Sequence, residues 1–394
     1  MIIGSHYAPY VALIGSYSIP LVGVEMVQYI WQTPEWPKFR WDSAALLRPL
    51  GKARRTQGEL LAKAAYCDIT LQAEVLTTEA LTTAAIEGER LNLDSIRSSV
   101  ARRLGLPTAG LPGPERHVDG LVEMLVDATR NHTTPLTTSR LKGWHAALFP
   151  TGYSGMSRIV VGEWRSGDAS MQVISGPIGR ETIHYEAPPV ERVDGEVRRF
   201  LEWFRSSQGQ LDGLVRAGVA HFRFVTIHPF QDGNGRIARA IADLALAQDE
   251  NSGRRLYSMS AQIKAERDAY YEILEKTQKG GVDITSWITW FLECLERATR
   301  RSEHEMQKSL DKARLWQHIA HLGLNERQRR VVNRLFEAGP GGFQGGLTNQ
   351  KYRGITKTTR ETAKRDMADL AAKGILARNP GGGRSVSYDL VWPM

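Results

Sequence analysis

The chain reads His-Pro-Phe-Gln-Asp-Gly-Asn-Gly-Arg-Ile-Ala-Arg from His228 to Arg239, and an apolar run with helical spacing covers residues 237–246. The turn at residues 233–235 therefore lies at the N-terminus of a predicted helix, where backbone N–H groups lack partners and the helix dipole is positive. Such a turn attracts anions, and phosphate above all. The stretch predicts a nucleotide-binding loop that leads into a helix.

The charged side chains of the same stretch suit a nucleotide polyphosphate. Asp232 is a hard oxygen ligand of the kind that Mg²⁺ prefers. Arg236 and Arg239 lie three residues apart, so both can face one helix end and donate paired hydrogen bonds to phosphoryl oxygens. His228 supplies a base with a pKa near neutrality. A structural histidine with surface charges explains any one of these residues alone, but their combination favours phosphate chemistry.

This segment resembles the signature of the Fic-domain family, His-x-Phe-x-Asp/Glu-Gly-Asn-Gly-Arg-x-x-Arg, and all eight specified positions are filled. Most members with an intact signature are adenylyltransferases, which move AMP from ATP onto a protein hydroxyl. The resemblance implies ATP as the substrate and Mg²⁺ as the cofactor. It also implies a target protein that offers a Ser, Thr or Tyr hydroxyl.

The resemblance implies a role for each signature residue. His228 would be the general base that takes the proton from the target hydroxyl, Phe230 would anchor the loop in the core, and Asp232 would hold Mg²⁺ on the α and β phosphates. The nucleotide-binding residues would be Gly233, Asn234 and Gly235 as the anion hole, Arg236 on the leaving phosphates and Arg239 on the γ phosphate.

Two further regions resemble parts of the family's site. Tyr270, Tyr271 and Gln278 resemble positions that wall the adenine pocket, although aromatic residues at such positions are also common in a hydrophobic core. The block from residue 162 to 189 resembles the flap, a hairpin beside the active site that aligns the target's backbone. Adding a strand to an exposed edge is a physically reasonable way to present a hydroxyl. The alternative is an ordinary surface hairpin.

An upstream segment resembles the family's inhibitory helix. Residues Thr83 to Gly88 match the pattern Ser/Thr-x-x-x-Glu-Gly/Asn, whose glutamate, here Glu87, inserts into the nucleotide site and pairs with Arg239. The resemblance implies an enzyme that is off by default, because the γ phosphate loses its cation. The same glutamate could position water to remove AMP from a modified target, and the short pattern also fits a solvated helix.

Composition places the chain among globular proteins. It has 394 residues, of which 42% are hydrophobic and 24% are charged, enough for two or three domains. Its two cysteines, Cys67 and Cys294, are too few for a disulfide framework and too far apart for a metal pair, which favours the cytoplasm. Residues 1–25 lack a basic start and are broken by Pro9 and Pro20. We expect no membrane segment there and interpret 1–25 as a disordered extension.

The periodicity predicts a mainly α-helical fold. Helical spacing covers residues 43–80 and 81–104, a Gly/Pro-rich connector follows at 107–114, and an alternating region at 159–185 predicts a β-hairpin. The chain from residue 26 onward resembles one subgroup of the family. Its predicted domains are an N-terminal helical domain at 26–113, a Fic catalytic domain at 114–300, a helical connector at 301–321 and a C-terminal domain at 322–394.

The C-terminal region is basic, with thirteen Lys and Arg against six Asp and Glu between residues 320 and 394, a net charge of +7. Three predicted helices and two strands around residues 380–384 resemble a winged helix-turn-helix, which implies DNA as a partner. The candidate DNA-binding residues are Thr358, Thr359, Arg360, Lys364 and Arg365 on the third helix and Arg384 on the wing. Protein docking or homodimer formation is the alternative.

Three functions remain open from the sequence. The leading interpretation is an Mg²⁺-dependent protein adenylyltransferase inhibited by Glu87. The second is a DNA-binding transcriptional regulator whose Fic core senses a nucleotide. The third is transfer of UMP or another phosphate-containing group on the same scaffold.

Overall fold

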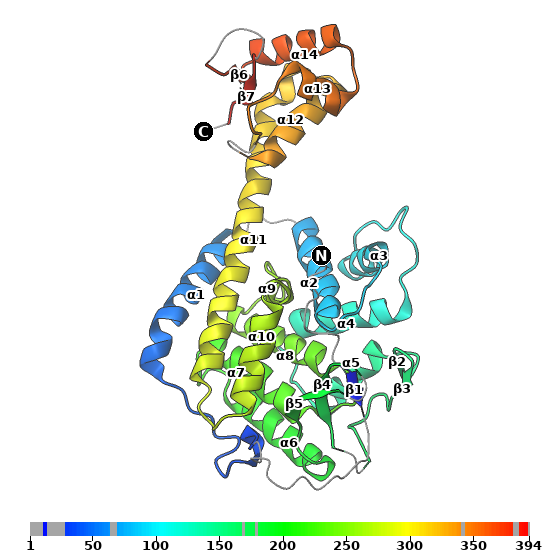
Figure 1. The fold of residues 1–394 in the computed structure, drawn as a ribbon, viewed down its shortest axis with the longest axis vertical. Helices are drawn as coiled ribbons and strands as arrows, with labels where there is room; N and C mark the ends of the chain where they lie inside the picture. The colour runs from blue at the N-terminus through cyan, green and yellow to red at the C-terminus, as the bar shows by residue number, and fades with distance from the viewer. Residues whose placement is uncertain are drawn as a thin grey trace. The chain divides into compact units, whose positions relative to one another are not determined.

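The computed structural model describes residues 28–63, 69–167, 170–177, 180–339, 343–380 and 386–392, together with the backbone of 11–13. The chain divides into two compact units, Met1–Ser302 and Glu303–Met394. The fold is mainly helical, which confirms the predicted class (Figure 1). Among the described residues, no helix is long and apolar enough to cross a membrane.

Two helices form the centre of the first unit. Helix α7 (Gly213–Ile227) packs along α8 (Asn234–Glu250), and every residue from Leu214 to Ile227 is buried. A helix that is buried on all sides belongs to the core. Asp212 caps α7 by accepting hydrogen bonds from the N–H groups of residues 214 and 215. The signature begins in the short α7–α8 connection and continues into the first turns of α8, so the core fixes both ends of the candidate site.

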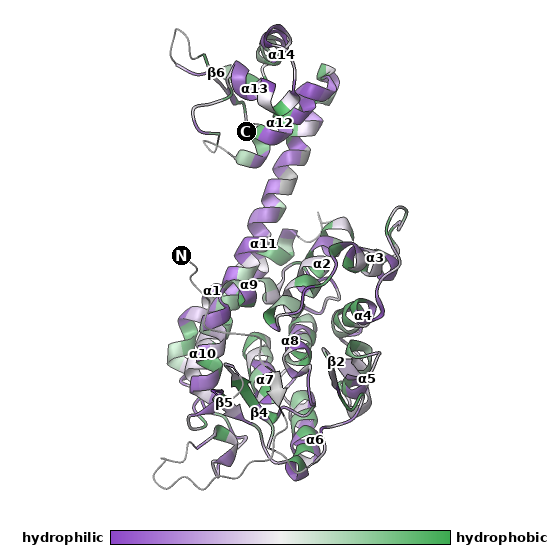
Figure 2. Cartoon of the chain, turned by 45° about the vertical axis from the view of Figure 1, so that its right-hand side comes forward, coloured by the Kyte–Doolittle hydropathy of each residue, from purple (hydrophilic) through white to green (hydrophobic). Residues whose placement is uncertain are grey.

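Other helices surround this pair. Helices α4 (Arg116–Arg130), α5 (Thr138–Leu148) and α9 (Met259–Ala265) contact α8, and α6 (Val190–Ser206) contacts α7. Helices α10 (Arg267–Gln278) and α11 (Thr285–Ile319) follow. Figure 2 shows that α11 is largely hydrophilic towards its C-terminal end.

The N-terminal helices are part of the same unit rather than a separate one. After the 3-10 helix η1 (Ile30–Gln32), helix α1 (Ser43–Lys63) lies beside α11, where Thr56 and Thr299 share a 2.7 Å hydrogen bond (Figure 1). Helix α2 (Ile69–Ile86) continues past the predicted break at residue 81, and the first left-handed residue after it is Gly88. Helix α3 (Leu93–Leu104) then ends at the left-handed Gly105, close to the predicted end.

A buried carboxylate attaches α2 to α9. Glu79 accepts hydrogen bonds from Ser258 Oγ at 2.6 Å, from the Ser260 N–H at 3.1 Å and from the Ser260 hydroxyl. A buried carboxylate needs several donors to offset its lost hydration. These contacts fix the helix that carries Thr83 and Glu87 against the catalytic unit.

The predicted β-hairpin is present but shorter than the alternating pattern. Strand β4 (Gln172–Ser175) pairs with β5 (Thr182–Glu186) in an antiparallel ladder that has an irregularity between Val173 and Ile174. A small hairpin, β2 (Tyr153–Ser154) with β3 (Ser157–Arg158), precedes it. Strand β1 (Val11–Leu13) pairs with β4, so these three residues differ from the expected disordered extension, and the rest of 1–25 lies outside the described residues.

The second unit has its own core. Helices α12 (Glu326–Ala338), α13 (Asn349–Thr356) and α14 (Arg360–Ala372) are followed by strands β6 (Leu376–Arg378) and β7 (Tyr388–Leu390), which pair antiparallel. The 3-10 helix η3 (Ala320–Leu322) precedes them. Helix α14 begins at Arg360 and not at Thr358, because the Thr359 hydroxyl accepts the Thr362 N–H as the N-cap. Arg384 lies outside the described residues.

The fold predicts a large stability effect at Phe222. Its ring is fully buried and lies 5.6 Å from the rings of Phe39 and Trp287, so it joins α7 to the N-terminal segment and to α11. Phe222→Ala should lower the free energy of unfolding of the first unit by about 3 to 5 kcal/mol, measured by urea denaturation. Met156→Ala, at a side chain that is 99% exposed, should change it by less than about 0.5 kcal/mol. Equal effects would contradict this packing.

Candidate active site

His228 is held in an orientation that suits a base. It ends α7 in a left-handed conformation (φ 51°, ψ 56°), and its Nδ1 lies 3.1 Å from the Val225 carbonyl oxygen. Nδ1 therefore carries the proton and donates it, which leaves the lone pair on Nε2. Burial lowers the pKa of His228 to about 4. The imidazole is accordingly neutral near pH 7 and can accept a proton.

Three side chains hold the backbone of the loop. Phe230 is fully buried and stacks on His145 at 4.2 Å. The Asn234 side chain accepts from the Phe230 N–H at 2.9 Å and donates to its carbonyl at 2.8 Å, so this amide fixes the loop. Arg165 donates through Nε to the His228 carbonyl at 2.8 Å and also donates to Pro188. Sequence reasoning missed Arg165, which lies 63 residues upstream of the histidine that it supports.

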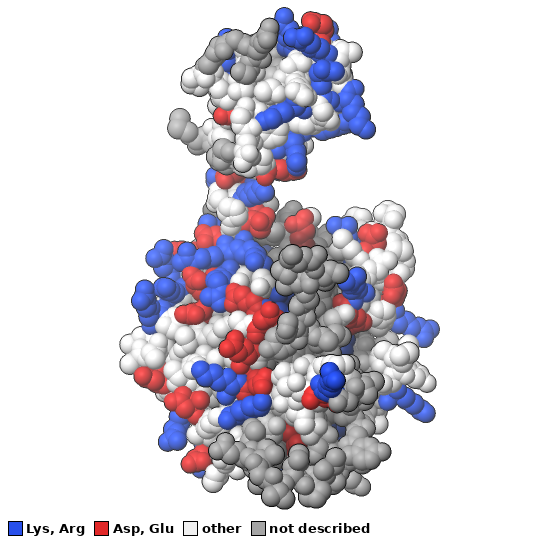
Figure 3. Space-filling view, viewed as in Figure 1, with Lys and Arg blue, Asp and Glu red and all other residues white. Residues whose placement is uncertain are grey.

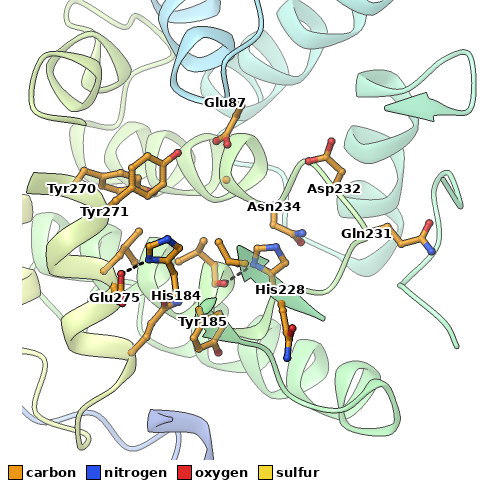
Figure 4. Close-up of a pocket in the computed structure, with 16 residues that line it drawn as sticks. Glu87, His184, Tyr185, His228, Gln231, Asp232, Asn234, Tyr270, Tyr271 and Glu275 are labelled. Carbon is orange, nitrogen blue, oxygen red and sulfur yellow. Dashed lines mark hydrogen bonds and ion pairs between the residues drawn. The ribbon is translucent and has the colours of Figure 1, made fainter. Parts of the chain in front are cut away.

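Asp232 lines the same pocket as His228 (Figure 4). Its carboxylate accepts the Gly233 N–H at 2.6 Å and the hydroxyl of Ser154, which belongs to β2. Among the described residues, no group of three or more acidic, His or Cys side chains is arranged to hold a metal ion. One carboxylate in a pocket fits Mg²⁺, since this ion commonly binds through one or two carboxylates, substrate phosphates and water.

Arg239 is paired with helix α2. Its Nη2 lies 2.8 Å from Glu87 Oε1, and its Nε donates to the Thr83 hydroxyl at 2.7 Å. A Cβ atom on Gly235 would lie 2.4 Å from Glu87 Oε1, so only glycine lets the carboxylate reach this position. The predicted Glu87–Arg239 contact is present in the structure, and the contact from Arg239 to Thr83 adds to it. Figure 4 shows Glu87 entering the pocket from the end of α2.

Arg236 has a different carboxylate partner. Its Nη1 lies 2.9 Å from Glu89 Oε2, and its Nη2 lies 3.6 Å from Asp232 Oδ2. The guanidinium also lies over the Phe149 ring, 4.9 Å from the centroid. Glu89 was not predicted, although it follows Glu87 by two residues.

The far wall of the pocket is aromatic. Tyr270, Tyr271 and Gln278 all line the pocket. The Tyr270 hydroxyl lies 2.9 Å from Nε2 of the buried His221, and Gln278 donates to Thr226 at 3.2 Å. The pocket lining also includes Glu87, His228, Asp232, Asn234 and Gly235.

The lining also contains a pair that sequence reasoning did not find. His184 on β5 has Nδ1 2.6 Å from Glu275 Oε2 on α10, and its Nε2 lies 2.6 Å from the Ser175 hydroxyl (Figure 4). His184 and the adjacent Tyr185 are both buried and both line the pocket, so alternation along β5 does not single out His184, and nothing in the sequence indicated its partner. The DNA-binding candidates lie in the second unit.

Comparisons with known proteins agree with this geometry. Residues 135–246 match the Fic/DOC family, and residues 29–106 match a domain of unknown function, DUF4172. The chain is 35% identical over 100 residues to "Protein adenylyltransferase Fic" of Culex quinquefasciatus and 33% identical over 102 residues to that of Aedes aegypti. These regions are 25% and 26% of this chain but 18% and 19% of the relatives, so the chain matches less than a fifth of each relative.

A solved structure shows the same fold. The crystal structure of a Fic family protein from Desulfovibrio desulfuricans G20 superposes with a TM-score of 0.51 at 18% identity, covering 89% of this chain and 97% of that one. The family match includes the α7–α8 loop. Residues 135–246 are thus a Fic/DOC family domain.

Proposed function

We propose that this chain is a protein adenylyltransferase that moves AMP from ATP to a hydroxyl side chain of a target protein. The observation that carries the proposal is one pocket in which a neutral His228 faces the Asp232 carboxylate and the N-terminus of α8. The adenylyltransferase names of the relatives support the same activity. UMP transfer is distinguished from it by offering labelled UTP in place of ATP.

The proposed reaction needs one base and a site for negative charge. The target hydroxyl oxygen bonds to the α phosphorus, the bond from that phosphorus to the oxygen bridging to the β phosphate breaks, and pyrophosphate leaves. The hydroxyl proton goes to Nε2 of His228. Arg236, Arg239 and the first N–H groups of α8 then stabilise the charge on the phosphates.

Asp232 would hold Mg²⁺ in this reaction. When it is bound, the ion would neutralise negative charge on the phosphates. The hydrogen bonds from Ser154 and from the Gly233 N–H keep the carboxylate directed at the pocket. The aromatic wall with Tyr270 and Tyr271 is suited to an adenine ring.

The proposed enzyme is inhibited by its own helix α2. While Glu87 occupies Arg239, the γ phosphate has no cation at this position and meets a carboxylate instead. Arg239 is 2% exposed, so this electrostatic effect is weakly screened by solvent and salt. Removal of AMP from a modified target, with Glu87 positioning the water, is the alternative role of the same carboxylate.

A second candidate function is DNA binding by the second unit, which we propose to be a winged helix. Arg360, Lys364 and Arg365 are exposed on α14, and Figure 3 shows Lys and Arg side chains gathered on this unit. The Asp366 carboxylate on the opposite side of α14 is buried and bonds to Arg327 and Tyr352. The exposed basic side chains can therefore contact an external partner such as DNA phosphates. The other DNA-binding candidates are Thr358, Thr359 and Arg384.

His228→Ala should remove transfer and leave ATP binding nearly unchanged, because the base acts on the target hydroxyl. Loss of a positioned general base lowers a rate by about 10²- to 10⁴-fold. Incorporation of labelled AMP, measured in a Glu87→Gly background, tests this, with the exposed His318→Ala as the control.

Since the pKa of His228 is about 4, the rate should stay flat from about pH 8 to 6 and fall as the imidazole becomes protonated towards pH 4. Full activity of His228→Ala would contradict this role, whereas a fall centred near pH 6.5 would contradict the lowered pKa of His228.

Glu87→Gly should raise AMP incorporation well above wild type, because it frees Arg239 and removes a negative charge from the phosphate site. Adding Arg239→Ala should erase that gain, which a merely loosened helix would not do. The measurement compares the three proteins at equal ATP and Mg²⁺. If a folded Glu87→Gly variant incorporates AMP only at the wild-type level, the inhibitory role of Glu87 is excluded. Release of AMP from a modified target would favour the alternative role of Glu87 in removing AMP.

The full chain should bind duplex DNA with an affinity that falls steeply as salt rises, because phosphate contacts release counterions. Reversing the charges at Lys364 and Arg365 should weaken binding, whereas reversal at the exposed Lys52 of the first unit should not. Fluorescence anisotropy with a labelled duplex measures both. Absence of binding at low salt would favour protein docking instead.

A further inference from the structure

The turn after α2 directs two carboxylates at the same helix. Glu89 N–H donates to the Ala84 carbonyl at 3.1 Å and Gly88 N–H to the Ala85 carbonyl at 3.2 Å, the hydrogen-bond pattern of a Schellman cap. Gly88 has φ +81°, which a residue with a side chain adopts only with strain. This left-handed residue between them lets Glu87 and Glu89 both reach the first turns of α8.

The two carboxylates contact two different arginines. Glu87 lies 2.8 Å from Arg239, and Glu89 Oε2 lies 2.9 Å from Arg236 Nη1. The Arg236 side chain is 8% exposed and that of Glu89 is 36% exposed. Within the described part of the chain, Arg236 Nε and Arg239 Nη1 are buried N–H groups without a hydrogen-bond partner. Both guanidinium groups thus keep a donor that a further anion would satisfy.

We propose that Glu89 is a second inhibitory carboxylate, which occupies Arg236 and competes with the leaving phosphates of the nucleotide. This inference rests on the proposed function, because it takes Arg236 to be the cation for those phosphates. Inhibition then consists of two ion pairs with separate targets. Glu87 opposes the γ phosphate at Arg239, and Glu89 opposes the phosphate next to the reacting one at Arg236.

Glu89 also lies near a histidine outside the site. Its Oε1 lies 3.9 Å from His117 Nε2, and the same His117 nitrogen lies 3.6 Å from Glu115 Oε2 at the start of α4. Glu115 therefore shares the surroundings of Glu89, and within the described residues it forms an ion pair with neither arginine. This makes Glu115→Gln a matched control for the loss of a nearby negative charge.

Nucleotides of different length separate this role from a structural one. Glu89→Gln should tighten ADP binding by about 3- to 10-fold, the effect of a partly exposed ion pair, because ADP carries the phosphate that needs Arg236. AMP lacks that phosphate, so its affinity should stay unchanged. A loosened α2 would instead open the pocket to AMP and ADP alike.

Isothermal titration of ADP and AMP in the presence of Mg²⁺ into wild type, Glu89→Gln and Glu115→Gln tests the proposal without turnover. We expect tighter ADP binding in Glu89→Gln alone. Unchanged ADP binding, or an equal gain for AMP, would overturn it. An equal gain in ADP affinity for Glu115→Gln would indicate a general charge effect and would also overturn the proposal. Titration of ATP into Glu87→Gly tests the proposed function separately. If that variant does not bind the nucleotide, both the proposed function and the role of Glu89 are contradicted.

Discussion

The buried guanidinium of Arg239 needs an anion beside it, and the arrangement of the site follows from this need. Its side chain is 2% exposed, and a buried charge that loses its partner costs about 3 to 5 kcal/mol. Glu87 satisfies it in this structure, and the proposed function gives the same place to a phosphate. The two anions exclude each other because both approach the same guanidinium next to Gly235. Docking of Glu87 at Arg239 and binding of the nucleotide are therefore alternatives in a single equilibrium.

This pairing works because both partners are carried by rigid elements. Arg239 projects from α8, which is buried along most of its length against α7. Glu87 follows α2, which the buried Glu79 ties to α9 and whose last carbonyl, that of Ile86, accepts from Arg267 at 2.9 Å. The base is positioned by the same core, since His228 ends α7. Small displacements of α2 would thus change the phosphate site without altering the catalytic loop.

The sequence predicted the helical class and the loop because their signals are local. Turn chemistry at residues 233–235 and helical spacing after it are properties of neighbouring residues, and the predicted Glu87–Arg239 contact depended on a family resemblance. The residues that were missed act across long separations. Arg165 and Ser154 reach the loop from 63 and 78 residues away, and the pair His184–Glu275 spans 91 residues. Periodicity cannot indicate such partners, because tertiary packing alone brings them together. Element ends also shifted where a side-chain cap decided them, as at Thr359.

The most direct test of this account is a double-mutant cycle on the free energy of unfolding of the first unit. Urea denaturation of wild type, Glu87→Ala, Arg239→Ala and the double variant isolates the energy shared by the two side chains. We expect a coupling energy of at least about 1 kcal/mol, because the partners touch in a buried environment and the single variants leave one charge unpaired. Effects that add to within about 0.5 kcal/mol would show that the pair does not hold α2 to the site, and would contradict the account.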